Sequence, residues 1–151
     1  MNIYAIVPAR SGSKRFRHKN IKLFRGIPLF QHSINFAKKL DYIKKIILTS
    51  DSQKYLNKAI KNKKLILHKR SNLSSKDTSM EEDILFDLKK FFSKKKIEIP
   101  DYILWLRPTH PLRCIKTFKN AFKLFRDNKF KSVMVVHKSE SRLFKVKDKY
   151  L

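Results

Sequence analysis

Short apolar runs alternate with segments of helical spacing along almost the whole chain, and this alternation constrains the fold most strongly. The runs have the length of buried strands and lie at residues 3–7, 46–49, 65–67, 102–106 and 132–136. Between them, apolar residues recur at helical spacing at residues 28–40, 52–62, 79–92 and 115–127. Alternating strands and helices are typical of parallel sheets. We therefore predict an α/β fold of three layers, with a mostly parallel sheet and helices on both faces.

Three of the expected helices carry a start signal. Pro28 suits a first helical turn, where its missing N–H is not needed. Ser52 is a good N-cap residue for the second helix. Ser79 and Glu82 have the spacing of a capping box, which predicts that the third helix starts after Ser79.

The size and the cysteine usage narrow the class of protein. A chain of 151 residues suits one domain, and a 42% apolar content argues against disorder. Cys114 is the one cysteine, so an internal disulfide and a cysteine-rich zinc site are excluded. No apolar run reaches the roughly 18 residues of a membrane span. We expect no signal peptide, no membrane partner and a cytoplasmic location.

The formal net charge of +25 allows two interpretations. Clustered cations bind polyphosphate, so a basic nucleic-acid-binding protein is one alternative. The basic residues are mostly lysine, however, and they are spread along the chain in pairs between apolar stripes. This pattern favours exposed helix and loop faces over a specific nucleic-acid site.

The polar segments that follow the strands are the places where a ligand is expected, because parallel sheets bind ligands at the carboxyl ends of their strands. The first such loop, residues 9–20, reads ARSGSKRFRHKN and places Gly12 among six basic residues. It matches neither the P-loop nor the dinucleotide-binding glycine pattern. From its residues alone, it is either a phosphate cradle or a generic basic loop.

Several motifs together resemble one known family. Residues 3–20 resemble the N-terminal signature of the acylneuraminate cytidylyltransferases, which are similar to the wider sugar nucleotidyltransferases. Further motifs resemble that family in the same order, at residues 22–29, 46–51, 69–78, 106–113 and 132–136. The resemblance covers residues 3–138 and implies a Rossmann-like nucleotide-diphospho-sugar transferase fold in a single domain, residues 1–151.

The implied reaction is the transfer of CMP from CTP to a sugar acid, such as sialic, legionaminic or pseudaminic acid, with release of pyrophosphate and with Mg²⁺ as the cofactor. The resemblance implies that three catalytic cations bind the triphosphate: Arg10, Lys14 and Lys19. It extends the nucleotide site to Ala9, Ser11, Gly12, Ser13, Asn20, Arg70, Asp77 and Thr78. The sugar acid would meet Arg107, Pro108, Thr109, His110 and Arg113.

Some of these residues have a second interpretation. Asp51 is a candidate metal ligand, and it could equally cap a helix. Asp77 could hold its own loop through an Asx turn. His110 stands where the family usually has serine, and Trp105 is expected in the core. Two further cations of the first loop are expected to face solvent: Arg15 and Arg17.

Two departures from the family leave alternatives open. Arg107 stands where sialic-acid enzymes commonly have glutamine, so the sugar acid is not fixed. Family members also usually continue beyond this chain, through a dimerisation segment and a late pair of metal-binding aspartates. The chain is therefore expected to be a short enzyme, a catalytically silent nucleotide-binding relative, or one piece of a split enzyme. A homodimer or a complementary polypeptide is the expected partner.

Overall fold

The computed structural model describes residues 1–12, 16–75 and 79–136. The chain divides into two compact units, residues 1–115 and the residues from Lys116 onward. Each unit is described separately below. The expectation of a single domain over residues 1–151 stays a prediction.

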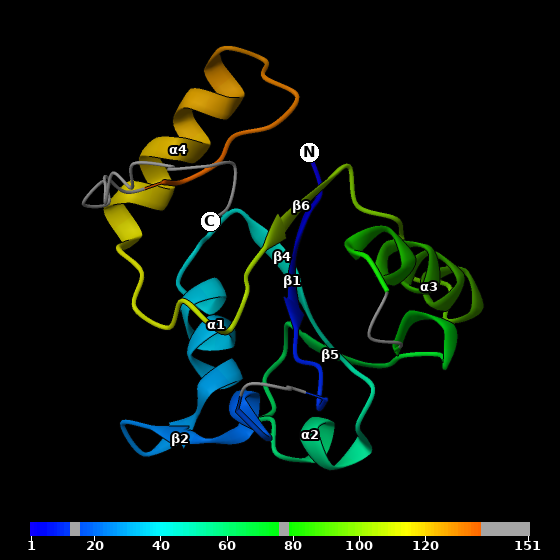
Figure 1. Ribbon diagram of the computed structural model, residues 1–151. Helices are drawn as coiled ribbons and strands as arrows, with labels where there is room; N and C mark the ends of the chain where they lie inside the picture. The colour runs from blue at the N-terminus through cyan, green and yellow to red at the C-terminus, as the bar shows by residue number, and fades with distance from the viewer. Residues whose placement is uncertain (13–15, 76–78, 137–151) are drawn as a thin grey trace, which may run out of the picture. The chain divides into compact units, whose positions relative to one another are not determined.

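A four-stranded parallel sheet forms the centre of the first unit (Figure 1). Its strands are β1 (Ile3–Pro8), β4 (Ile43–Ser50), β5 (Leu65–Lys69) and β6 (Tyr102–Trp105), in the spatial order β5-β4-β1-β6. All three neighbouring pairs are parallel, and Ile6 of β1 pairs with Ile47 on one side and with Trp105 on the other. The predicted parallel sheet and four of its five predicted strands are confirmed.

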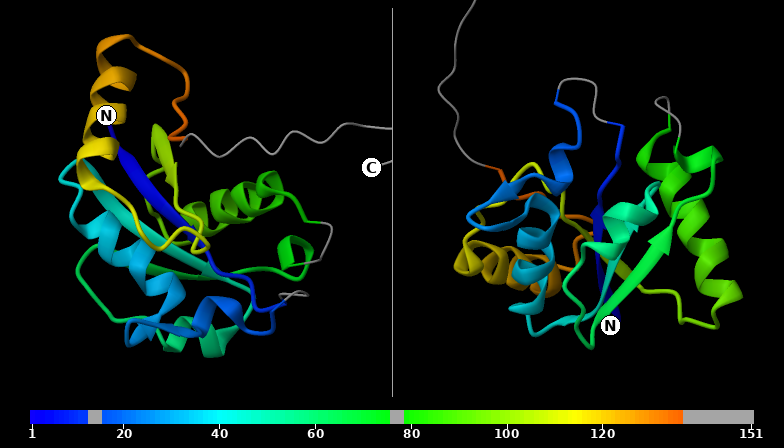
Figure 2. Two further views of the ribbon diagram at one scale, coloured as in Figure 1. Left: turned by 60° about the vertical axis from the view of Figure 1, so that its left-hand side comes forward. Right: turned by 90° about the horizontal axis from the view of Figure 1, so that it is seen from below.

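Two helices cover opposite faces of this sheet. Figure 1 and the view from below in Figure 2 show α1 (Leu29–Lys38) on one side of the strands and α3 (Glu81–Lys94) on the other. Successive strand side chains point to opposite faces, so β1 supplies Tyr4 and Ile6 to the α3 side. There they pack, together with Ile47, against three buried residues of α3: Ile84, Leu88 and Phe92. The predicted three layers are confirmed for this unit.

The start of α3 differs from the prediction. The helix begins at Glu81, and the Met80 N–H donates to Asp83 Oδ2 at 2.7 Å. Ser79 instead donates its hydroxyl to the carbonyl of Leu73 at 2.8 Å. The predicted capping box of Ser79 and Glu82 is therefore wrong. The helix starts later, so the carboxylate that accepts from the N-cap N–H is that of Asp83.

Shorter elements join the main ones. The helix predicted at 52–62 is shorter, α2 (Gln53–Asn57). Two short strands, β2 (Leu23–Phe24) and β3 (Ile27–Pro28), form an antiparallel hairpin before α1. Its two turn residues, Arg25 and Gly26, have φ angles of 49° and 79°. Positive φ at both positions favours glycine at Gly26, as in tight hairpin turns. Two 3-10 helices, η1 (Lys19–Ile21) and η2 (Leu73–Ser75), complete the unit.

The helix predicted at 115–127 is confirmed as α4 (Ile115–Asp127), almost all of which belongs to the second unit. The strand predicted at 132–136 is wrong, because this segment joins no ladder among the described residues. Met134 is 83% exposed there, whereas a buried strand needs neighbours on its edges and over its faces. None of the described helices is both long and apolar enough to cross a membrane.

Candidate functional site

A cavity of about 470 Å³ lies where β1, β5 and β6 end. Its wall combines residues at and just beyond the ends of these strands with residues of η1 and residues around the start of α3. They are Pro8, Arg10, Lys19, Asn20, Arg70, Ser79, Met80, Glu81, Ile84, Trp105, Arg107, Pro108 and Thr109. The predicted ligand position at the carboxyl ends of the strands therefore coincides with a cavity of a size typical of small-molecule sites.

The first loop is fastened to the end of β4. The Ala9 N–H donates to the Thr49 carbonyl at 2.9 Å, and Ser50 Oγ donates to the Ala9 carbonyl at 2.7 Å. Ser11 then donates its N–H and its hydroxyl to the two carboxylate oxygens of Asp51, at 2.7 and 2.6 Å. Asp51 therefore holds the loop in place, and its role as a metal ligand stays a prediction.

Two candidate cations of this loop reach the cavity. Arg10 and Lys19 are half-buried and line its wall. Asn20 is buried, and its side-chain amide donates to the Arg10 carbonyl at 2.8 Å, which braces the backbone beside Arg10. Gly12 is exposed. The other predicted residues of this loop, Ser13, Lys14 and Arg15, lie outside the described residues, as do Asp77 and Thr78.

Arg70 is the buried cation of the cavity wall. Only 6% of the residue is exposed, and burial lowers the pKa of its guanidinium to about 10. Its Nε donates to Thr49 Oγ1 at 3.1 Å and its Nη2 to the Thr49 carbonyl at 3.3 Å. Among the described residues, no carboxylate lies within ion-pair distance of this guanidinium. A buried charge without an ion-pair partner is costly, so Arg70 is suited to an anionic or strongly accepting ligand.

The loop after β6 supplies the opposite rim of the cavity. Arg107 is exposed and donates from Nε to Glu81 Oε1 at 3.1 Å, while Pro108 and Thr109 also line the wall. His110 is exposed and is not part of this wall, and its Nδ1 lies 3.2 Å from Thr109 Oγ1.

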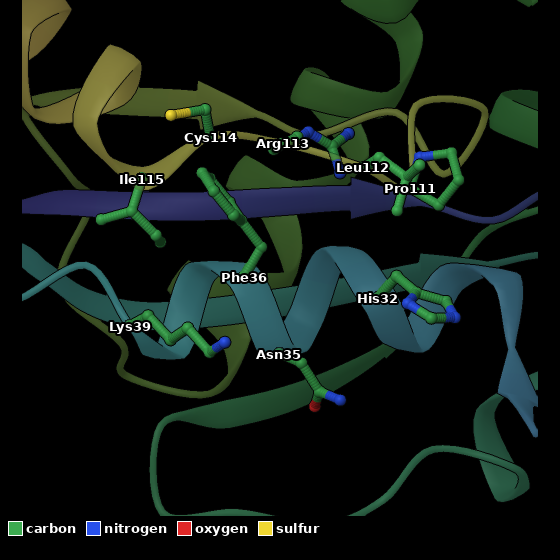
Figure 3. Close-up of a pocket in the computed structure, with 9 residues that line it drawn as sticks. All are labelled: His32, Asn35, Phe36, Lys39, Pro111, Leu112, Arg113, Cys114 and Ile115. Atoms are coloured by element: carbon green, nitrogen blue, oxygen red, sulfur yellow. The ribbon is translucent and has the colours of Figure 1, made fainter. Parts of the chain in front are cut away.

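Arg113 lines a different cavity, of about 510 Å³, between α1 and residues 111–115 (Figure 3). Its guanidinium donates to Ser33 Oγ at 3.0 Å and to the Arg107 carbonyl at 2.6 Å. It also lies over the Phe36 ring, 5.7 Å from the centroid. Burial lowers the pKa of Arg113 to about 10. Arg113 thus joins this loop to α1 and lines a different cavity from Arg107, Pro108 and Thr109, and its binding role stays a prediction.

Sequence reasoning missed the apolar part of the first cavity. Trp105 was expected in the core, and it does pack against the core on the α3 side, but it also lines the cavity. Ile84 and Met80 of the α3 region join it there. The available signal was that Trp105 stands next to the carboxyl end of the strand predicted at 102–106, close to the position from which ligands are contacted.

The arrangement suits a ligand with an anionic part and a flat apolar part. Four basic residues line the cavity together with the indole of Trp105, and Glu81 already binds one of them, Arg107. No group of three or more His, Cys, Asp or Glu side chains gathers among the described residues. Mg²⁺ is commonly held by one or two carboxylates together with substrate phosphates, so the expected Mg²⁺ cofactor stays a prediction. We assign no chemical step to a metal.

Comparison with known proteins identifies related chains. The family model described as "Cytidylyltransferase" matches residues 4–149. A CMP-N,N'-diacetyllegionaminic acid synthase from Legionella pneumophila is 32% identical over 126 residues, which are 83% of this chain and 54% of the relative. A pseudaminic acid cytidylyltransferase from Campylobacter jejuni is 32% identical over 87% of this chain and 56% of its own length. An N-acylneuraminate cytidylyltransferase from Escherichia coli is 30% identical over 98% of this chain and 35% of its own length.

Solved structures agree on the fold. A CMP:2-keto-3-deoxy-manno-octonic acid synthetase complexed with CTP superposes with a TM-score of 0.65 at 16% identity, over 85% of this chain and 49% of that chain. A cytidylyltransferase from Leptospira borgpetersenii gives a TM-score of 0.61 at 18% identity, over 85% of this chain and 50% of that chain. The predicted Rossmann-like fold is confirmed. The chain spans about half the length of the first two of these curated relatives.

Proposed function

Because this chain belongs to the cytidylyltransferase family, we propose that it provides the CTP-binding part of an enzyme that transfers CMP to a sugar acid. The observation that carries the proposal is the buried Arg70 guanidinium in a cavity that Trp105 also lines. The cation suits the polar edge of a base or a phosphate, and the indole suits the flat face of a base.

In the proposed reaction, a hydroxyl oxygen of the sugar acid bonds to the α-phosphorus of CTP. The bond from that phosphorus to the bridging oxygen breaks, pyrophosphate leaves, and the hydroxyl proton goes to solvent. Negative charge on the phosphates is the main obstacle, so fixed cations contribute most. Arg10 and Lys19 are proposed to bind the triphosphate, together with Lys14, which lies outside the described residues.

The proposed second substrate is a nonulosonic acid of the kind named for the relatives: legionaminic, pseudaminic or N-acylneuraminic acid. Each has a carboxylate, and Arg107 at the rim of the cavity offers a guanidinium that can bind one in a bidentate manner. In the structure the Arg107 guanidinium is paired with Glu81, so an incoming carboxylate would exchange this surface ion pair for one with the substrate.

The remaining parts of the proposal come from the resemblance and from the length of the relatives. The partner is a second copy of this chain or a complementary polypeptide, and the compartment is the cytoplasm. An Mg²⁺ requirement also stays a proposal, and CTP titrations with and without Mg²⁺ test it.

Pyrophosphate release tests the function directly. Purified protein is incubated with CTP, Mg²⁺ and each of the three nonulosonic acids, and pyrophosphate is measured against a reaction without sugar acid. Release that depends on one sugar acid supports the enzyme. Saturable CTP binding without release supports the second candidate, a silent nucleotide-binding relative. Equal binding of CTP and inorganic triphosphate contradicts both.

A further inference from the structure

Polar side chains that do not line the cavity form a hydrogen-bonded row with Arg70. Thr49 at the end of β4 is fully buried, and His68 of β5 is 2% exposed. Thr49 Oγ1 lies 3.1 Å from Arg70 Nε and 2.9 Å from His68 Nδ1. His68 Nε2 in turn lies 3.7 Å from Asp87 Oδ2 of α3. The row therefore connects three secondary-structure elements to one guanidinium.

The hydrogen bonds of this row have a fixed direction. Arg70 Nε can only donate, so Thr49 Oγ1 is the acceptor there. The Thr49 hydroxyl still has one hydrogen to donate, and a buried hydroxyl without an acceptor is costly. The acceptor within reach among the described residues is His68 Nδ1. Thr49 therefore donates to His68, and this requires a ring nitrogen Nδ1 that carries no hydrogen.

The remaining ring hydrogen of a neutral His68 is then on Nε2, which faces Asp87. Burial lowers the pKa of His68, and although Asp87 raises it, the nearby Arg70 lowers it further. The other neighbour from α3 is the uncharged ring of Phe91, 4.7 Å away between centroids. A protonated His68 would have a hydrogen on Nδ1, which would leave the Thr49 hydroxyl without its acceptor.

Asp87 fixes the far end of the row. Its Oδ2 accepts from the Ser74 hydroxyl at 2.6 Å and from the Ser71 N–H at 2.8 Å. Burial alone would raise the pKa of Asp87, but the hydrogen bonds from Ser74 and Ser71 lower it below its ordinary value. The carboxylate is therefore ionised, and it holds the segment after Arg70 against α3.

We propose that Thr49 and His68 are positioning residues that aim the Arg70 guanidinium into the cavity through this one-directional row. The two bonds to Thr49 occupy Nε and Nη2, and no partner of Nη1 lies within the part of the chain that the structure describes, so we assign Nη1 to a ligand. The inference rests on the proposed function only in that Arg70 binds CTP. The direction of the row does not depend on it.

CTP titration of three proteins tests the positioning role: the wild type, Thr49→Val and Thr49→Ser. Valine has nearly the shape of threonine without the hydroxyl, and serine retains the hydroxyl. We expect Kd for CTP to rise about tenfold in Thr49→Val, which is about 1.4 kcal/mol, and serine to restore tight binding. In an Arg70→Ala background, Thr49→Val should have no further effect, because it acts through Arg70. Wild-type affinity in a folded Thr49→Val protein, or an equal loss in the Arg70→Ala background, overturns the proposal.

Nitrogen-15 NMR of the wild-type imidazole tests the direction of the row without any ligand. At neutral pH we expect His68 Nδ1 to resonate as an unprotonated nitrogen and Nε2 to carry the hydrogen. A hydrogen on Nδ1 would contradict the proposed direction of the hydrogen bonds in the row, even if CTP binds. If the wild type fails to bind CTP, the proposed function fails, and the tautomer still decides whether the row exists. A Thr49→Val protein that does not fold leaves this NMR result as the deciding measurement.

Discussion

Arg70 is the residue on which the nucleotide site depends most, because its guanidinium is buried and, among the described residues, no carboxylate lies within ion-pair distance of it. Asp51 and Asp87 raise its pKa only from a greater distance, and burial outweighs them. We expect Arg70→Ala to raise Kd for CTP by at least tenfold, the usual loss for a charged hydrogen-bond donor in a buried site. The matched control is Arg17→Ala, which removes an exposed arginine of the first loop and should leave Kd unchanged. Calorimetric titration measures both. An equal effect of the two substitutions would mean that CTP responds to net charge alone.

His68 makes the stability of the protein depend on pH. The pKa of His68 in the fold is below its ordinary value of 6.5, so the unfolded chain takes up a proton before the folded chain does. The unfolding free energy should therefore fall as the pH drops below 6.5, until the folded His68 also titrates. His68→Asn retains an acceptor near the Nδ1 position and cannot titrate. Its unfolding free energy should therefore fall less than that of the wild type over this pH range. Urea unfolding on either side of 6.5 compares the two proteins, and parallel curves would contradict the prediction.

Residues whose roles follow from their position along the chain could be predicted, and residues whose roles depend on packing could not. Arg10, Lys19, Arg70 and Arg107 were all predicted, and they line one cavity because each lies in a loop near the carboxyl end of a parallel strand or just beyond it. The support of Arg70 was not predicted. His68 reaches Thr49 and Asp87 only through packing between β5, β4 and α3, and no local pattern encodes such a contact.

At the scale of elements, α3 contributes residues both to the hydrophobic core and to the cavity wall. Its buried Leu88 packs on β1 and β4, so Leu88→Ala should lower the unfolding free energy by about 2–5 kcal/mol. Leu85 of the same helix is 37% exposed, and Leu85→Ala is the matched control with a much smaller expected loss. Chemical denaturation of both variants measures the difference. Similar losses would contradict the observed orientation of α3.

The predicted elements succeeded where local sequence suffices. The runs at β1, β4, β5 and β6 are short and apolar, and each one meets a neighbouring strand in the sheet. The run at 132–136 has the same pattern but joins no ladder among the described residues, since strand formation also needs a partner strand, which is often far away in sequence. The start of α3 also differs from the prediction: Glu82 and Asp83 both suit the reciprocal capping position, and the structure uses Asp83.

At the scale of the whole molecule, the net charge of +25 attracts any polyanion, and this attraction must be separated from specific binding. Binding of DNA or of inorganic triphosphate to exposed lysines should weaken steeply as salt is raised to about 0.15 M. CTP binding should weaken less, because Arg70 is buried and is screened less by salt. Titrations at low and at higher salt measure the two slopes. Equal slopes would favour the basic nucleic-acid-binding interpretation over a nucleotide site.

The most direct test of the nucleotide site uses the fluorescence of Trp105, the one tryptophan of the sequence, which lines the cavity. Titration with CTP should change this fluorescence in a saturable manner. The change should be larger than with ATP or inorganic triphosphate. In Arg70→Ala, the Kd for CTP obtained from this change should be at least tenfold higher. A fluorescence that does not respond to CTP, or that responds equally to every polyanion, would contradict the account.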